Sequence, residues 1–335
     1  MILSKTPVRI AFGGGGTDVE PYSSDYGGMV VNATINRYFR VFLSKSGENV
    51  IKIFSNDTFT PYKFRIIDKF NDISVKGDLI KAIVVYSQPH EGMDIYIHGE
   101  APKKAGLGAS ASLTCAILGG IETLLKNPIN FDHIAESAYK IEQNILKNEG
   151  GRQDQYAAVH GGLNCFEFLG GSKVQVYPLE ISESFLKLIE ENLILYYTGV
   201  PHLSGNLVKK QVNKYLNEKQ KAKQYLDKLK DIGYQIKDAL VEENFERFGT
   251  LLTRDWEVKT QFNPAITTKL MEDLNKAVMT NGGIGGRVCG AGGGGCMIWL
   301  VEKGKKEEIL KKLRDKKGYS INFNFTKSGL EFLNV

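Results

Sequence analysis

The chain has 335 residues and a formal net charge of +5, with 42% apolar and 24% charged residues. This length exceeds what one hydrophobic core usually serves, so we expect two domains of an ordinary globular protein. The basic residues are dispersed and no apolar run is long enough to cross a bilayer, which argues against nucleic-acid and membrane partners.

The first residues and the cysteines bear on the cellular compartment. Residues 1–5 run directly into a predicted strand at 8–12, so we expect no signal peptide. No C-x-x-C pair occurs among the four cysteines, so neither a zinc site nor a disulfide framework is indicated. We therefore expect a cytoplasmic protein.

A run of four glycines, Gly13 to Gly16, follows the first strand and leads into Thr17 and Asp18. Such a run costs conformational entropy on folding and is typical of backbone that approaches a ligand closely. Thr-Asp-Val-Glu-Pro then follows, where a dinucleotide-binding loop would open a helix with a further glycine. A flexible turn is the alternative interpretation.

Alternating apolar residues predict the next strands, and helical spacing predicts one helix among them. We expect strands at 29–31, 38–43, 50–54, 62–66 and 93–97, and a helix at 77–87.

The stretch from Gly106 to Ser112, four residues after Pro102, enters a predicted helix that ends at Asn127-Pro128. A glycine-containing loop at a helix start leaves backbone N–H groups without acceptors, and these groups and the helix dipole attract anions such as phosphate. The hydroxyls of Ser110 and Ser112 lie within reach of a metal or a phosphate oxygen. An ordinary capped helix is the alternative.

Two acidic residues follow this loop. Glu142 is in phase with the apolar face of a helix predicted over 131–147, where a carboxylate is costly unless it is paired or binds a metal. Asp154 comes after a glycine turn, at the start of the next predicted helix. A salt-bridged glutamate and a helix-capping aspartate are the alternatives.

The second half mixes strands and helices in the manner of a ferredoxin-like fold. We place the domain boundary between residues 185 and 186, after a hairpin at 161–168 and 173–177. Beyond it we expect strands at 193–197, 297–301 and 319–325, a glycine-rich loop at 290–295, and helices at 205–230, 233–241, 243–260, 265–280 and 304–316.

The order of these motifs resembles the GHMP kinase superfamily over essentially the whole chain. The resemblance implies an α+β fold of two domains: a ribosomal-protein-like ATP-binding domain at 1–185 and a ferredoxin-like domain at 186–335. It implies ATP and Mg²⁺ as cofactors, and a monomer or homodimer.

The resemblance also implies roles for individual residues. The ATP-phosphate loop would comprise Pro102, Ala105, Gly106, Leu107, Gly108, Ala109, Ser110, Ala111 and Ser112. Ser110 and Glu142 would bind Mg²⁺, and Asp154, aided by Arg9, would be catalytic. Substrate contacts would come from Gly14, Gly15, Gly16, Thr17, Asp18, Asp154, Gly290, Ala291, Gly292 and Gly293.

Within the superfamily, the first glycine motif looks like the D-glycero-D-manno-heptose 7-phosphate kinase branch. That similarity implies phosphorylation of the anomeric hydroxyl to give a 1,7-bisphosphate. The chain departs from the family at Ala109, where a serine is common, and at His202, where a basic residue is common. Candidates for holding the distal phosphate are Arg152, Arg287, Lys103, Lys104 and His202.

Three other functions remain open from the sequence. A neutral-sugar 1-kinase resembling fucokinase shares the first glycine motif. A non-catalytic sugar and nucleotide sensor on the same fold is the second. The presence of Arg9, Glu142 and Asp154 together argues against it, because a sensor does not need catalytic residues. A Rossmann oxidoreductase is suggested only by the glycine-rich loops, and their spacing disfavours it.

Overall fold

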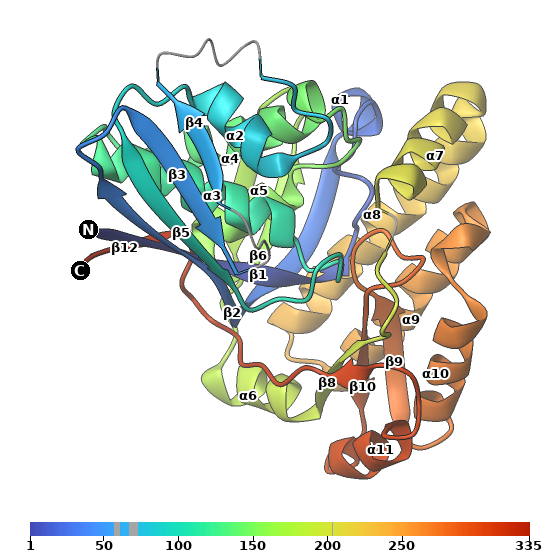
Figure 1. Ribbon diagram of the computed structural model, residues 1–335. Helices are drawn as coiled ribbons and strands as arrows, with labels where there is room; N and C mark the ends of the chain where they lie inside the picture. Colours follow the sequence, from blue (N-terminus) through green and yellow to red (C-terminus); the bar gives the residue numbers. More distant parts are fainter. Residues whose placement is uncertain (57–60, 67–72, 203) are drawn as a thin grey trace.

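The computed structural model describes residues 1–56, 61–66, 73–202 and 204–335, without the side chains of 204–206 (Figure 1). Within these residues the strands form two sheets. The eight-stranded sheet contains β1 (Ile2–Gly13), β2 (Gly28–Lys45), β3 (Val50–Ser55), β4 (Tyr62–Arg65), β5 (Met93–Gly99), β6 (Leu163–Phe168), β7 (Val174–Pro178) and β12 (Glu331–Asn334). The four-stranded sheet contains β8 (Leu193–Tyr197), β9 (Gly283–Val288), β10 (Cys296–Val301) and β11 (Tyr319–Ser320).

Helices pack on both sheets and confirm the α+β class. In the first half they are α1 (Tyr22–Tyr26), α2 (Leu79–Ser87), α3 (Ala109–Leu124), α4 (Phe131–Lys140), a π-helical turn (Ile141–Ile145), α5 (Gln153–His160) and α6 (Glu183–Asn192). In the second half they are α7 (Ser204–Asn217), α8 (Lys219–Val241), α9 (Phe245–Phe262), a 3-10 turn (Pro264–Ile266), α10 (Lys269–Met279) and α11 (Lys306–Leu313).

Strand β1 is central to the architecture because it connects both halves of the chain. It pairs antiparallel with β2 on one side and with β12 on the other, so the two termini lie side by side (Figure 1). Helices α3, α5, α8 and α9 all contact β1, whose far end leads into the glycine run. The division at residues 185 and 186 stays a prediction, although β12 returns the chain to the first sheet.

The helix expected over 131–147 is regular only as far as Lys140. A π-helical turn from Ile141 to Ile145 then carries Glu142, and Leu146 N–H donates to Ile141 O at 3.0 Å across it. A π-helical turn widens the helix and changes the direction of its side chains, and such turns are frequent at functional sites. Helical periodicity alone cannot predict this local widening.

The helix break expected between 230 and 233 is wrong, because α8 runs unbroken through Gly233 and the break falls at Glu218. Gly233 instead allows a close approach. A Cβ there would lie 2.2 Å from Met29 Sδ and 3.2 Å from Gly14 Cα. Gly233, which looks like a helix breaker in the sequence, therefore allows α8 to pack closely against the first glycine run.

The end of the chain also differs from the expectation. The strand expected at 319–325 is regular only over β11, and Phe325 forms an isolated bridge with Ile35. Strands β9 and β12 were not expected at all. The glycines of β9 hide the strand pattern in the sequence. Gly285 is needed for contact with α9, because a Cβ there would lie 1.8 Å from Gly249 O.

A fully buried ion pair fastens the second half of the chain to the end of β1. Arg287 Nη1 on β9 lies 3.0 Å from Asp255 Oδ2 on α9, and neither side chain is exposed. Arg287 Nη1 also donates to Phe12 O at 2.6 Å, and Gly14 N–H donates to Asp255 Oδ1 at 2.9 Å. Because a buried charge is stable only with its partners, this pair orders the glycine run against α9 and β9.

We expect Asp255→Asn to lower the free energy of unfolding by about 3 kcal/mol, because it leaves the Arg287 charge buried without a counter-ion. Urea denaturation monitored by circular dichroism measures the change. Asp238→Asn is the matched control, because Asp238 pairs with Lys237 at 3.1 Å on the surface and its loss costs at most about 1 kcal/mol. Equal midpoint shifts for the two variants would contradict this role for Asp255.

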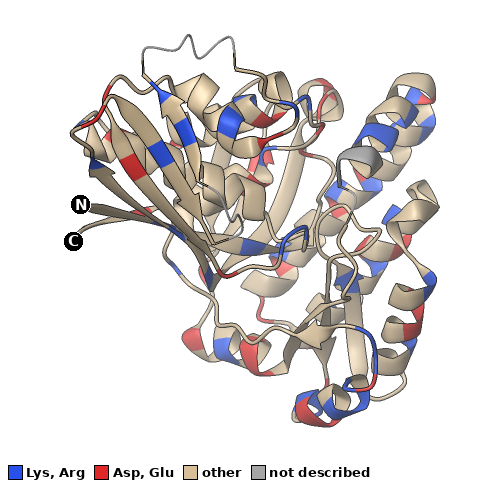
Figure 2. Cartoon of the chain, in the orientation of Figure 1, with Lys and Arg blue, Asp and Glu red and all other residues tan. Residues whose placement is uncertain are grey.

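Charged residues of both signs are dispersed along the described chain (Figure 2), and they alternate on α8, whereas the charged residues of α7 are all lysines. Lys223 on α8, for example, pairs with Asp227 at 2.5 Å. No helix among the described residues combines the length and apolarity needed to cross a bilayer.

Candidate active site

A cavity of about 550 Å³ opens where β1, the loop before α3, the start of α5, helices α7 and α9, and the loop after β9 converge. Fourteen predicted site residues line it, although they come from four separate stretches of sequence. They are Arg9, Gly15, Gly16, Asp18, Ala105, Gly106, Gly108, Ala109, Ser110, Ala111, Glu142, Asp154, Gly290 and Ala291.

The loop before α3 has the geometry of an anion cradle. Gly106 and Gly108 have φ angles of 77° and 75°, a region that favours glycine. Gly108 is the N-cap of α3 and offers no side chain, so the first N–H groups of the helix face the cavity without a capping partner. These groups and the helix dipole suit a phosphate, so the loop fits the nucleotide that the sequence implies.

The glycine-rich loop after β9 is fastened against this cradle. Cys296 N–H donates to Ala105 O at 2.7 Å, and a Cβ on Gly106 would lie 2.8 Å from Cys289 O. Gly290 and Ala291 reach the cavity, and both halves of the chain thus form its wall.

Arg9 and Asp154 meet at the centre of the cavity, 145 residues apart in the sequence. Arg9 Nε donates to Asp154 Oδ1 at 2.8 Å, Arg9 Nη2 lies 2.6 Å from the same oxygen, and Arg9 Nη1 donates to Gly106 O at 2.5 Å. The Arg9 side chain is 5% exposed and that of Asp154 is 28% exposed. Asp154 lines the cavity and its Oδ2 has no hydrogen bond to the described residues, while Arg9 fixes the position of Asp154 relative to the cradle.

Ser110 and Glu142 present oxygen atoms on another side of Asp154. Ser110 Oγ donates to Glu142 Oε1 at 2.5 Å, and Gln155 Nε2 donates to Glu142 Oε2 at 2.8 Å. Burial raises the pKa of Glu142 to about 7, against the opposing effect of the Ser110 hydrogen bond. A carboxyl and a hydroxyl beside a phosphate cradle fit a hard divalent cation that completes its coordination with phosphate and water.

Asp18 is held against the first glycine run and Gln153, the residue before Asp154. Its carboxylate accepts hydrogen bonds from Gly16 N–H at 3.0 Å and from Gln153 N–H and Nε2, each at 3.2 Å. Complete burial raises its pKa, although these N–H groups oppose the shift. An acceptor-rich side chain fixed in this way suits the hydroxyl groups of a polyol.

Some predicted residues do not line the cavity. Ser112 Oγ is fully buried and shares a 2.8 Å hydrogen bond with Thr6 Oγ1, so its hydroxyl joins α3 to β1. Thr17 Oγ1 donates to Gly14 O and Met29 O, each at 2.8 Å, and so holds the glycine turn. The others outside the lining are Pro102, Leu107, Gly14, Gly292 and Gly293.

The five candidate residues for binding a distal phosphate differ in whether they line the cavity and carry a charge. Arg152 is bound by Glu20 and Glu136, each at 3.1 Å, and, like Lys103, does not line the cavity. His202 lines it, but burial and the charge of Arg9 lower its pKa to about 4, so it carries no charge at neutral pH. Lys104 and Arg287 also line it.

Gln153, Gln211 and Lys259 are among the lining residues that were not predicted from the sequence. Gln211 Nε2 on α7 donates to Gly16 O at 2.8 Å. Lys259 and Asp255 share the inward face of α9, in phase with Phe248, Leu252 and Phe262. Glu142 was selected because a charged residue fell on the apolar face of a predicted helix. The same criterion, applied to the helix expected at 243–260, would have selected Lys259 and Asp255.

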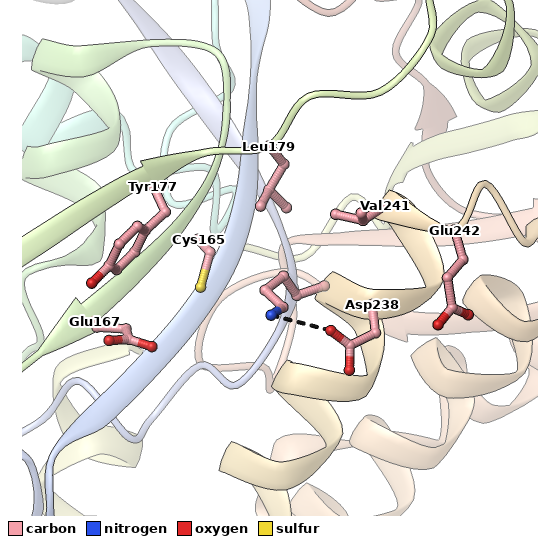
Figure 3. Close-up of a pocket in the computed structure, with 8 residues that line it drawn as sticks. Cys165, Glu167, Tyr177, Leu179, Asp238, Val241 and Glu242 are labelled. Atoms are coloured by element: carbon pink, nitrogen blue, oxygen red, sulfur yellow. Dashed lines mark ion pairs between the residues drawn. The ribbon is translucent and has the colours of Figure 1, made fainter.

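A second hollow of about 350 Å³ lies between β6, β7 and the end of α8 (Figure 3). Its one lysine is paired, since Lys237 Nζ lies 3.1 Å from Asp238 Oδ1, and burial raises the pKa of Cys165 to about 12. Unlike the first cavity, it presents no cation without a partner and no reactive thiolate.

The comparisons with known proteins agree with this geometry. The family model described as GHMP kinases N terminal domain matches residues 76–162, and that described as GHMP kinases C terminal matches residues 236–319. A Campylobacter jejuni protein named D-glycero-alpha-D-manno-heptose 7-phosphate kinase is 31% identical over 98% of both chains. A mevalonate kinase of Pyrococcus abyssi is 24% identical over 100% of this chain and 98% of its own.

Solved structures show the same fold. A crystal structure described as a D-glycero-D-manno-heptose 1-phosphate kinase from Bacteroides thetaiotaomicron has a TM-score of 0.82 and 27% identity, over 100% of this chain and 99% of its own. A putative sugar kinase from Campylobacter jejuni has a TM-score of 0.78 and 29% identity, over 100% and 98%. The two named heptose kinases differ in the position given for the phosphate.

Proposed function

The chain belongs to the GHMP kinase family, and from this premise we propose that it phosphorylates the anomeric hydroxyl of D-glycero-D-manno-heptose 7-phosphate. The protein is a kinase, and members of its family use ATP as phosphate donor, generally with a divalent metal. The product would be the 1,7-bisphosphate.

The observation that carries this proposal is the Arg9–Asp154 pair beside the phosphate cradle. In the transfer, a bond forms between the anomeric oxygen and the γ-phosphorus of ATP while the bond from that phosphorus to the leaving ADP oxygen breaks. Asp154 accepts the hydroxyl proton through its free oxygen. Arg9 stabilises the charge on the moving phosphoryl group, and catalysis rests mainly on alignment and on neutralised charge.

We further infer that the metal is Mg²⁺ and that Ser110 and Glu142 hold it. Oxygen ligands from one serine and one glutamate, completed by nucleotide phosphates and water, match the preference of this ion. Once bound, Mg²⁺ would offset negative charge on the donor phosphates. Ala109, where the family commonly has serine, leaves Ser110 as the hydroxyl at this position.

Asp18 supports a polyol acceptor. Its carboxylate is enclosed by the first glycine run and by Gln153, the residue before Asp154. The names of the 31% identical relative and of the structural neighbour support a heptose phosphate as that polyol. The neutral-sugar 1-kinase and the non-catalytic sensor are the alternatives that an activity screen separates.

A coupled ADP-release screen over D-glycero-D-manno-heptose 7-phosphate, fucose, galactose and mevalonate tests the proposal. We expect kcat/KM for the heptose 7-phosphate to exceed that for every other acceptor by at least about 100-fold, because each well-placed buried polar contact to a substrate contributes about tenfold or more. Fucose as the best substrate would favour the neutral-sugar kinase. ATP binding without turnover of any acceptor would favour the sensor.

We also infer a cytoplasmic location and a monomer or homodimer. The four cysteines are free and buried in the structure, which suits a reducing compartment.

A further inference from the structure

Among the charged groups around the cavity, two buried cations are left with unused hydrogen-bonding capacity. Lys259 is 8% exposed, and its ammonium has no hydrogen bond or ion pair within the described part of the chain. Arg287 is fully buried, and its Nη2 has no hydrogen-bond partner there. By contrast, the side chains of Arg9, Asp18 and Glu142 are all engaged with neighbours.

Lys259 lines the cavity beside the first glycine run. A Cβ on Gly15 would lie 3.2 Å from Lys259 Nζ and 3.5 Å from Gln153 Nε2, so the ammonium ends directly against the first glycine run. The charges of Asp18 and Arg9 both act on Lys259. The cation therefore lies beside the first glycine run and Asp18, which are the proposed contacts of the sugar.

The local charge balance favours an anion at this position. Arg287 is neutralised by Asp255 at 3.0 Å, which leaves the charge of Lys259 without a counter-ion. Burial and the nearby charge of Arg287 lower the pKa of Lys259 to about 8. A buried charge without a partner is costly, and a bound dianion would supply the missing partner.

We propose that Lys259, supported by Arg287 in the cavity wall, binds a phosphate monoester carried by the acceptor sugar and so selects sugar phosphates over neutral sugars. This inference rests on the proposed sugar-kinase function. The sequence interpretation offered Arg287 for this role and did not consider Lys259. Arg287 is a positioning residue, because Asp255 and Phe12 O hold its guanidinium.

The test measures kcat and KM with the full chain at saturating ATP, for D-glycero-D-manno-heptose 7-phosphate and for the same heptose without phosphate. We expect Lys259→Met to raise KM for the phosphorylated acceptor roughly 10- to 100-fold, the loss of one charge-assisted hydrogen bond. The kcat, the KM for ATP and the kcat/KM for the neutral heptose should stay within about threefold of wild type. Arg254→Met removes an exposed cation from the same helix and should change none of these values.

Inorganic phosphate provides a second readout. It should compete with the phosphorylated acceptor in the wild type and lose that competition in Lys259→Met. A further readout is pH. The wild-type KM for the phosphorylated acceptor should rise as pH increases through about 8, where Lys259 loses its proton, while the neutral heptose shows no such rise. The described charged groups facing Lys259 are Arg9, Asp18, Asp255 and Arg287.

Two results would overturn the inference and assign Lys259 to the donor phosphate. One is an equal fall in kcat/KM for both acceptors, and the other is a lower kcat together with a higher KM for ATP. Unchanged kinetics in a folded Lys259→Met protein would also overturn it. If no sugar is turned over, the proposed function fails separately. A calorimetric titration of heptose 7-phosphate into the protein, in the presence of a non-hydrolysable ATP analogue, then decides whether Lys259 holds the phosphate.

Discussion

Replacing Asp154 with asparagine should lower kcat by about 10³-fold, the contribution of a well-placed general base. An asparagine oxygen can still accept from Arg9 Nε, so the geometry of the pair is preserved while the proton acceptor is lost. ATP should bind the variant with near-normal affinity, because the loop before α3 is unchanged. Steady-state kinetics and a calorimetric titration with ATP measure the two quantities.

Asp132→Asn is the control for this substitution, because Asp132 pairs with His160 at 2.9 Å on the surface, away from the cavity. It should leave kcat unchanged. An Asp154→Asn protein whose kcat stays within tenfold of wild type would remove Asp154 from the chemistry. A loss of ATP binding would instead indicate that the variant has disturbed the cradle.

Arg9→Lys keeps the positive charge but should lower kcat by about 10²- to 10³-fold, as the loss of a fixed transition-state donor does. Arg9 uses three nitrogens, two toward Asp154 and one toward Gly106 O. A lysine ammonium cannot span both partners in this geometry, so the carboxylate and the cradle lose their common anchor. The measurement is kcat at saturating ATP and sugar.

A double-variant cycle tests whether Arg9 and Asp154 act as a unit. If they do, Arg9→Lys combined with Asp154→Asn should be little slower than Asp154→Asn alone, because effects within a catalytic unit are not additive. Fully multiplicative losses would contradict the shared role. Arg40→Lys is the matched control, because Arg40 pairs with Glu100 away from the cavity.

The fold class and the family could be predicted because each glycine motif leaves a local signature and the order of the motifs is specific. Arg9 and Asp154 are 145 residues apart, and periodicity alone gave no reason to join them. The resemblance to a family supplied that link. Glu142 was found from its phase on a helix, because a carboxylate aimed inward requires a partner.

The missed features depend on packing that the sequence does not display. The π-helical turn at Ile141–Ile145 changes the direction of Glu142 without any breaking residue. Gly233 reads as a break but serves helix contact, and the glycines of β9 conceal a strand that α9 covers. Ser112 has the same side-chain chemistry as Ser110. Because it lies two positions later on α3, its hydroxyl points into the core, where it meets Thr6. Only the fold distinguishes the two serines.

Phosphorus NMR of the products, after the protein is incubated with ATP, Mg²⁺ and D-glycero-D-manno-heptose 7-phosphate, tests the central claim most directly. We predict a second phosphomonoester signal that couples to the anomeric proton and grows in step with ADP. Phosphate on any other oxygen of the sugar would contradict the claim. So would ADP that accumulates together with inorganic phosphate while the sugar signal stays unchanged.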